Sequence, residues 1–248
     1  MSIRRACVRT VNSFVSLVII LALLLFGSYS AYALWDNRQI YSAAQNVQLQ
    51  MKELKPDIQA ETGPSFEELL AINPDVRAWV TMDGTKIDYP VLQGETNLSY
   101  INTDVYGKFA LAGSIFLDCR NSPDFSDTYN LVYGHHMANS NMFGDLDLYK
   151  DPKFFRENTT GTLITRDGVY DLTVLALIMV SASEDNIFEV PRNQNPDTVI
   201  AFTRENAELL SDKMPQLGED VQFFALSTCS SEFTDARTIV LTAMNRRA

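Results

Sequence analysis

An uncharged, mostly apolar stretch near the N-terminus restricts the start of this chain to a helix. No charged side chain occurs from Thr10 to Trp35, and the run FVSLVIILALLLFGSYSAYAL occupies Phe14 to Leu34. About 20 apolar residues span the hydrocarbon core of a bilayer, where the backbone must satisfy its own hydrogen bonds. The sequence therefore predicts a transmembrane anchor over residues 12–35.

The charges that flank this stretch predict its orientation. Three arginines, at positions 4, 5 and 9, precede it, and Asp36 follows it. The positive-inside rule then makes residues 1–11 a cytoplasmic tail. We expect a single-pass protein of the plasma membrane with its C-terminal body, residues 65–248, outside the cell.

A cleaved signal peptide is the alternative for the same stretch. Its densest apolar part, Val15 to Phe26, has the length of a signal-peptide core, and Ala31-Tyr32-Ala33 has the form of a cleavage site. Composition alone leaves both alternatives open. Either one places the body outside the cytoplasm.

The rest of the chain has the composition of an acidic globular protein. Of the 248 residues, 46% are hydrophobic and 21% are charged, which excludes an intrinsically disordered chain. This length allows one sizeable core or two small domains. The net charge is −11 although the first 35 residues carry only basic charges, and such an acidic body disfavours nucleic-acid binding.

Many short β-branched or aromatic runs predict a mainly β fold with peripheral helices, arranged as a closed or nearly closed barrel. Residues 36–64 predict a juxtamembrane helix that ends near Pro56 and a short linker. The expected strands are AWVTM, IDYPVL, SIFLD, NLVYGHH, TLITR, YDLTVLALIMV, VQFFALST and RTIVLTAM. The expected helical pieces are FEELLAIN, MFGDLDLY, DPKFFREN and PDTVIAFTRENAELL.

Cysteine and histidine are rare in this chain. Cys7 falls in the predicted tail, so Cys119 and Cys229 are the cysteines of the body, and they could pair in an oxidising compartment. The two histidines, His135 and His136, are adjacent, and no C-x-x-C or H-x-x-x-H motif is present. The sequence therefore predicts no zinc site and no disulfide scaffold.

Cys229 ends the apolar run VQFFALST, and Arg237 begins the next run. A thiol needs a base or a nearby positive charge to act as a nucleophile near neutral pH. His135 or His136 could transfer the proton. Arg237 cannot act as a base, but it could stabilise an oxyanion, and together these groups suit acyl transfer through a thioester.

Two alternatives compete with this interpretation. Arg237 could instead form a surface ion pair with Glu232 or Asp235. Cys119 is a rival nucleophile, but the carboxylate of the preceding Asp118 would raise the pKa of its thiol and oppose activation.

Four motifs in the same order resemble those of the class B sortases, over about residues 65–243. Residues 225–229, ALSTC, followed by Arg237, resemble the family pattern T-L-x-T-C with a later arginine. Residues 133–137, YGHHM, followed by NMFG, resemble the family's histidine motif. The segments SFEELLAINPDVRAWVTMDGTKIDYPVLQ and GSIFLDCRN are also similar to class B sequences. Ala225 departs from the family's usual threonine, at a position upstream of the chemistry.

The resemblance assigns roles residue by residue. It implies that Cys229 is the nucleophile, that His135, directly after the glycine, is the general acid/base, and that Arg237 holds the oxyanion or the substrate. The matching stretch before the cysteine supplies the candidate substrate-binding residues Leu226, Ser227 and Thr228. No cofactor and no metal are expected.

The resemblance also implies a fold and an activity. The fold is an eight-stranded β-barrel that an uncleaved transmembrane helix anchors to the membrane of a Gram-positive-type cell. The activity is cleavage of a C-terminal sorting motif of exported proteins after threonine, followed by transfer to an amine of a cell-wall precursor. Alternatives are a pilus-assembling sortase that uses a pilin lysine, a secreted cysteine peptidase, and an exported binding module with a structural thiol.

Overall fold

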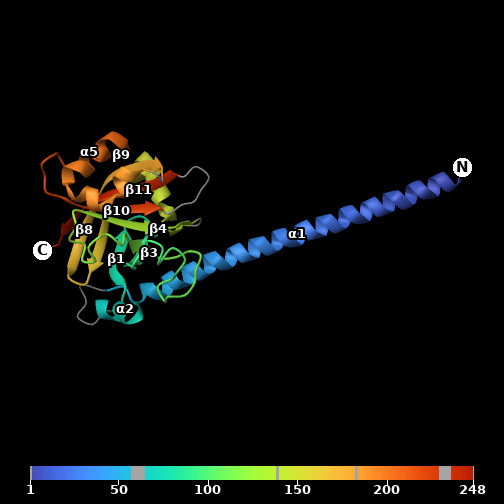
Figure 1. Ribbon diagram of the computed structural model, residues 1–248, viewed down its shortest axis with the longest axis horizontal. Coiled ribbons are helices and arrows are strands. Elements are labelled where there is room, and N and C mark those ends of the chain that lie inside the picture. The colour runs from blue at the N-terminus through green and yellow to red at the C-terminus, as the bar shows by residue number, and fades with distance from the viewer. Residues whose placement is uncertain (1, 57–64, 138–139, 182–183, 229–235, 248) are drawn as a thin grey trace. The chain divides into compact units, whose positions relative to one another are not determined.

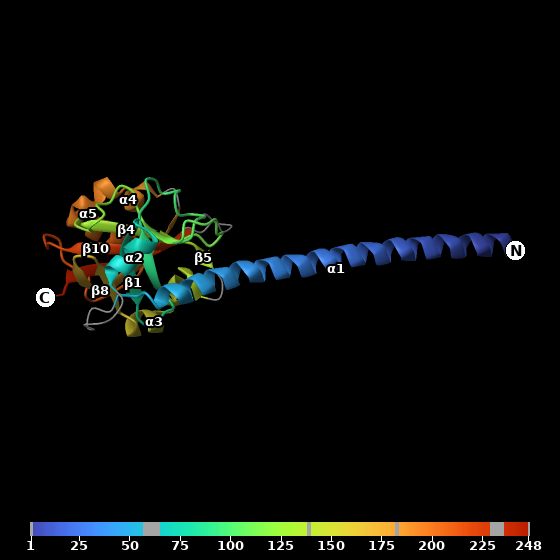
Figure 2. The same ribbon diagram turned by 90° about the horizontal axis from the view of Figure 1, so that it is seen from below.

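The computed structural model describes residues 2–56, 65–137, 140–181, 184–228 and 236–247 (Figures 1 and 2). It divides the chain into two units, Met1–Ala43 and Ala44–Ala248. The helices are α1 (Ser2–Lys52), α2 (Phe66–Ile72), η2 (Gly144–Lys150), α3 (Pro152–Glu157), α4 (Asp185–Phe188), η3 (Val190–Gln194) and α5 (Pro196–Asn206), of which η2 and η3 are 3-10 helices. The strands are β1 (Val76–Met82), β2 (Asp88–Leu92), β3 (Ile115–Leu117), β4 (Tyr129–Gly134), β5 (His136–Met137), β6 (Asn141–Met142), β7 (Thr160–Thr165), β8 (Gly168–Ser181), β9 (Ala207–Leu210), β10 (Gln222–Thr228) and β11 (Ala236–Arg246).

The N-terminal unit lies within the helix α1. By length and composition, this helix is apolar enough to cross a membrane from Val11 onward. The predicted anchor and juxtamembrane helix are therefore parts of one helix, which ends at Lys52. The predicted linker lies mostly outside the described residues.

Eight strands close into a β-barrel, which confirms the predicted fold. Their order around the ring is β1–β2–β3–β4–β10–β11–β8–β7, and β7 pairs with β1 to complete it. Neighbouring strands are antiparallel except β2 with β3 and β4 with β10, which are parallel. The short strand β9 pairs with β8 outside this ring.

Most strands are buried on both faces, which explains their unbroken apolar runs. In β10, Phe224 and Leu226 belong to the main core, whereas Phe223 and Ala225 belong to a second cluster with residues of α4, η3 and α5. Alternate side chains of a strand point to opposite faces, so both faces of this strand are covered. Figure 1 shows α5 and α2 on opposite sides of the strands, and α2 packs against a third cluster, which includes Trp79.

The structure departs from the predicted elements at several places, of which two are the largest. The run AELL, predicted as the end of a helix, forms β9, because α5 ends at Asn206 and the edge of β8 offers Ala207–Leu210 backbone partners. The run NLVYGHH was predicted as one strand. Instead β4 ends at Gly134, and His136 begins the separate strand β5.

Asp88 of β2 joins the end of α1 to the barrel. Its Oδ1 accepts hydrogen bonds from Lys55 Nζ at 2.8 Å, Trp79 Nε1 at 2.7 Å and Thr81 Oγ1 at 3.1 Å, and Lys52 Nζ lies 3.3 Å from Oδ2. Burial by itself would raise the pKa of Asp88. The hydrogen bonds from Lys55 and Trp79 and the charges of both lysines outweigh it, so the pKa is lowered.

Replacing Asp88 with asparagine is expected to lower the free energy of unfolding at neutral pH by about 1.5–3 kcal/mol, because charge-assisted hydrogen bonds are lost. The carboxylate contributes its full stability above its pKa in the unfolded chain, about 3.9, and this contribution falls to zero as pH decreases through the lower folded-state pKa. The difference between wild type and Asp88→Asn should therefore shrink as pH falls below about 4.

Urea denaturation of both proteins along a pH series measures this difference. Asp171→Asn is the matched control, because Asp171 pairs with Arg247 at the surface, where an ion pair contributes little. A difference between wild type and Asp88→Asn that stays constant down to about pH 2 would show that Asp88 does not titrate as described.

Candidate active site

Parallel pairing of β4 and β10 brings two motifs to one edge of the barrel. In the register, Ser227 lies beside Tyr133 and Thr228 beside Gly134. Parallel strands end at the same edge of a sheet, so His135, directly after β4, lies at the end of β10. Cys229 follows Thr228 in sequence but lies outside the described residues.

Arg237, the second residue of β11, lies beside the end of β10. Its Nη1 donates a hydrogen bond to the carbonyl oxygen of Thr228 at 3.0 Å. The adjacent N–H of Thr238 donates to Thr228 Oγ1 at 3.1 Å. The guanidinium group is therefore held at the last described residue before Cys229. Glu232 and Asp235, the alternative ion-pair partners, lie outside the described residues.

His135 lies between β4 and β5 and is half-buried. Its ring Nε2 lies 2.8 Å from the carbonyl oxygen of Ile101, and its own carbonyl oxygen accepts from the N–H of Phe143 at 3.0 Å. Because a carbonyl oxygen can only accept, Nε2 must carry a proton. In the neutral ring, Nδ1 then has a lone pair that can accept a proton.

His136 has a different environment from its neighbour. Its Nε2 lies 2.7 Å from Asp147 Oδ2, and Lys150 Nζ lies 2.5 Å from the other carboxylate oxygen. Burial opposes ionisation of Asp147, but the hydrogen bonds from Lys150 and His136 outweigh it and lower the pKa of this carboxyl. His136 is therefore hydrogen-bonded to Asp147 of η2, which also pairs with Lys150.

The three candidate substrate-binding residues are buried. Leu226 faces the barrel core, and the side chain of Ser227 is fully enclosed, with its hydroxyl 3.4 Å from the carbonyl oxygen of Thr228. Thr228 is 2% exposed. The structure thus places these side chains in the packing beneath the site, and a binding role for them stays a prediction.

Cys119, the rival nucleophile, is a free, half-buried thiol just beyond β3. Its backbone N–H donates to Asn97 Oδ1 at 2.7 Å. Within the described ranges, no group of three His, Cys, Asp or Glu side chains could hold a metal ion.

Two contacts near the histidine were missed from the sequence. The carbonyl of Ile101 comes from the long segment between β2 and β3, whose path no short motif reveals. Asp118 is fully buried and accepts hydrogen bonds from Arg120 and Tyr133. The spacing of an aspartate and an arginine in GSIFLDCRN is the one signal that could have indicated this pair.

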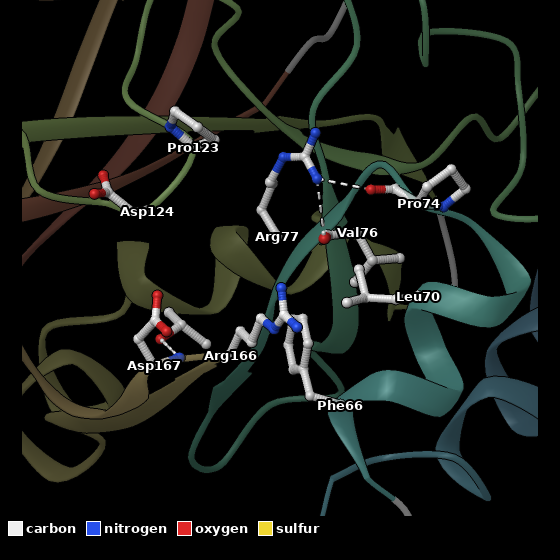
Figure 3. Close-up of a pocket in the computed structure, with 10 residues that line it drawn as sticks. Phe66, Leu70, Pro74, Val76, Arg77, Pro123, Asp124, Arg166 and Asp167 are labelled. Carbon is white, nitrogen blue, oxygen red and sulfur yellow. Dashed lines mark hydrogen bonds between the residues drawn. The ribbon is translucent and has the colours of Figure 1, made fainter.

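A depression of about 410 Å³ lies elsewhere on the barrel (Figure 3). Side chains of α2, β1 and the turn between β7 and β8 line it, together with Pro123 and Asp124. Its two arginines already have partners, since Arg166 pairs with Glu67 at 3.0 Å and Arg77 donates to the carbonyl oxygen of Pro74 at 2.7 Å. No residue predicted for the chemistry lines this depression.

Comparisons with known proteins find relatives over most of the chain. No protein-family model matches the chain. A curated relative named Sortase B, from Staphylococcus aureus, is 26% identical over 231 residues, which cover 92% of this chain and 94% of the relative.

Two solved structures are similar over most of the body. The crystal structure of a class B sortase from Streptococcus pyogenes, described as involved in pilus biogenesis, is 36% identical with a TM-score of 0.66, and covers 73% of this chain and 97% of that one. A Staphylococcus aureus sortase B–substrate complex is 26% identical with a TM-score of 0.68, and covers 86% and 98%. With this identity and coverage on the same closed eight-stranded barrel, the chain belongs to the class B sortases, a family of cysteine transpeptidases.

Proposed function

We propose that this class B sortase is a membrane-anchored transpeptidase that cleaves a sorting motif near the C-terminus of exported proteins after threonine and transfers the acyl part to an amine of a cell-wall precursor. The contact between Arg237 and the carbonyl oxygen of Thr228, at the edge where His135 follows β4, is the observation that carries the proposal. It concentrates a positive charge and an imidazole at the strand end from which Cys229 continues.

The proposed reaction has two halves. The thiolate of Cys229 attacks the carbonyl carbon of the threonine in the motif, and Arg237 stabilises the oxyanion. His135, holding the thiol's proton, gives it to the leaving amine as the peptide bond breaks. In the second half the acceptor amine attacks the thioester, its proton passes to His135, and Cys229 leaves as a thiolate.

The contact to Ile101 supports this role of the imidazole. A ring nitrogen that donates to a backbone carbonyl has a fixed tautomer and a fixed ring plane. In the neutral ring this leaves Nδ1 of His135 as the proton acceptor. The same contact would still hold the ring after it becomes protonated on both nitrogens, because Nε2 remains a donor.

A second candidate acceptor is the side-chain amine of a pilin lysine. The similar Streptococcus pyogenes structure is described as involved in pilus biogenesis, and it is 36% identical to this chain. That likeness favours testing both amines. A secreted cysteine peptidase, which would release a free acid, is the remaining candidate enzyme.

We also propose the membrane arrangement that the sequence predicts. Residues 1–11 would be cytoplasmic, residues 12–35 would span the membrane, and residues 36–64 would connect them to the extracellular catalytic body of residues 65–248. Arginines before the apolar segment and an aspartate after it support this orientation.

The test uses the full chain in detergent micelles with quenched peptides of NPxTx, LPxTx and SPxTx type. Each peptide is incubated alone, with a glycine-initiated peptide whose N-terminal amine is free, and with an acetylated peptide whose amine is a lysine side chain. Mass spectrometry should find cleavage after threonine and an amide-linked product with one of the two amines.

The identity of the productive amine separates the wall-precursor candidate from the pilin candidate. A free acid as the only product, with both amines in excess, would contradict the transpeptidase proposal and favour the peptidase.

A further inference from the structure

A fully buried carboxylate, Asp118, lies directly after β3 and is satisfied by three side chains. Oδ1 accepts from the backbone N–H and from Nε of Arg120, both at 2.9 Å. Oδ2 accepts from Arg120 Nη2 at 2.9 Å, Asn97 Nδ2 at 2.9 Å and the hydroxyl of Tyr133 at 3.0 Å. Burial would raise the pKa of Asp118, but these donors outweigh it and lower the pKa, so the carboxylate stays ionised.

Arg120 connects this carboxylate to a distant part of the chain. Its Nη2 donates to the carbonyl oxygen of Phe188 at 2.6 Å, and its Nη1 donates to Glu189 Oε1 at 3.1 Å. Both acceptors belong to residues 184–194, the α4–η3 segment. The flat guanidinium group can make these contacts and the paired contact to Asp118 at once, whereas an ammonium group cannot.

Asp118 and Arg120 contact three segments of the chain. Each of these segments contains, contacts or follows a strand paired with a residue proposed for the chemistry. Tyr133 lies two residues before His135 and pairs with Ser227. Asn97 belongs to the segment whose Ile101 contacts the imidazole ring.

The α4–η3 segment approaches the site from β8. It follows the end of that strand, where Val180 pairs with Arg237 of β11. Its residues Ile187 and Val190 pack in the second cluster, over the outer face of β10.

From this arrangement we propose that Asp118 and Arg120 are positioning residues, which fix the α4–η3 segment as a wall of the groove that binds the sorting peptide. This inference rests on the proposed function. Asp118 is fully buried whereas Arg120 is exposed. An ion pair contributes little net stability in such a setting, so its role here is to define the position of the segments that it joins. Arg120 donates the hydrogen bonds that hold the α4–η3 segment, and Asp118 fixes the orientation of Arg120.

The proposal predicts a separation of kinetic constants. Without Arg120, the segment should occupy the binding position for a smaller fraction of the time, so the Michaelis constant for the sorting peptide rises by about tenfold or more, the loss expected for one charge-assisted hydrogen bond. The turnover number should change by less than about threefold, because the reacting groups are untouched. Arg120→Lys should lie between wild type and Arg120→Ala.

The experiment measures peptide-cleavage kinetics and backbone hydrogen exchange on the full chain in detergent micelles. Wild type, Arg120→Ala and Arg120→Lys are compared with Arg156→Ala, which removes an exposed arginine from α3, outside the segment. We expect faster exchange in residues 184–194 and a higher Michaelis constant in Arg120→Ala, an intermediate result in Arg120→Lys, and neither change in Arg156→Ala.

Three outcomes would overturn the proposal. Unchanged exchange in residues 184–194 of Arg120→Ala would show that Arg120 does not hold the segment. Faster exchange with unchanged kinetics would show that the segment is not a wall of the groove. A fall in turnover number together with a lower melting temperature would assign Arg120 a structural role alone.

Failure of the proposed function gives a different result. If wild type cleaves none of the peptides, the transpeptidase proposal and the wall role that rests on it are both lost. Hydrogen exchange, which needs no activity, then decides separately whether Arg120 holds the segment in place.

Discussion

Replacing Cys229 with alanine is expected to remove cleavage and amide transfer together, with a fall in turnover number of at least about 1,000-fold. Loss of a covalent nucleophile has effects of this size or larger, because binding and oxyanion stabilisation alone give only a small residual rate. The sorting-peptide assay with and without an amine measures both activities in one experiment.

Cys119→Ala is the matched control for this substitution. Cys119 is a free, half-buried thiol just beyond β3, whereas Cys229 follows Thr228, whose carbonyl oxygen accepts a hydrogen bond from Arg237. We expect Cys119→Ala to keep activity within about twofold of wild type. Activity that survives in Cys229→Ala and is lost in Cys119→Ala would show that Cys119, and not Cys229, is the nucleophile.

The second large effect is expected at His135. Replacing it with alanine should lower the turnover number by about 100- to 10,000-fold, the range for loss of a general acid/base. Its contact with Ile101 leaves Nδ1 of the neutral ring as a proton acceptor, whereas His136 is engaged with Asp147. The two adjacent histidines therefore have different expected roles although the sequence motif presents them together.

His136→Ala is the internal control. It removes one hydrogen bond to Asp147, so we expect a loss of about 1–2 kcal/mol in the free energy of unfolding and a turnover number within about threefold of wild type. Steady-state kinetics and urea denaturation of both variants separate the two effects. A larger loss of turnover in His136→Ala than in His135→Ala would reverse the assignment.

Most strands of the barrel could be predicted from their apolar runs, because a strand that is buried on both faces has an uninterrupted apolar sequence. FFAL in β10 has its alternate residues in two different clusters, so the run has no polar interruption. AELL, in contrast, was predicted as helix from its composition. Its conformation depends on the exposed edge of β8, and a partner more than 25 residues away along the chain leaves no local signal.

In the candidate site, too, some contacts could be predicted from the sequence and others could not. Strand ends and the hairpin between β10 and β11 follow from sequence order, and they bring Arg237 to Thr228 as the motif implies. The link from Arg120 to Phe188 and Glu189 joins positions 68 and 69 residues apart, and only the closed barrel brings them together. Tertiary contacts of that kind could not be predicted from one sequence.

Trapping the acyl-enzyme is the most direct test of the central claim, which is a thioester on Cys229 that an amine resolves. The full chain is mixed with the best sorting peptide without amine, quenched in acid, and analysed by intact and peptide-level mass spectrometry. We predict an added mass equal to the part of the peptide that ends at threonine, located on Cys229, and its disappearance with formation of the amide product when amine is added. An adduct on Cys119 would contradict the account. Continued turnover without an adduct on any cysteine, even after rapid quenching, would contradict it as well.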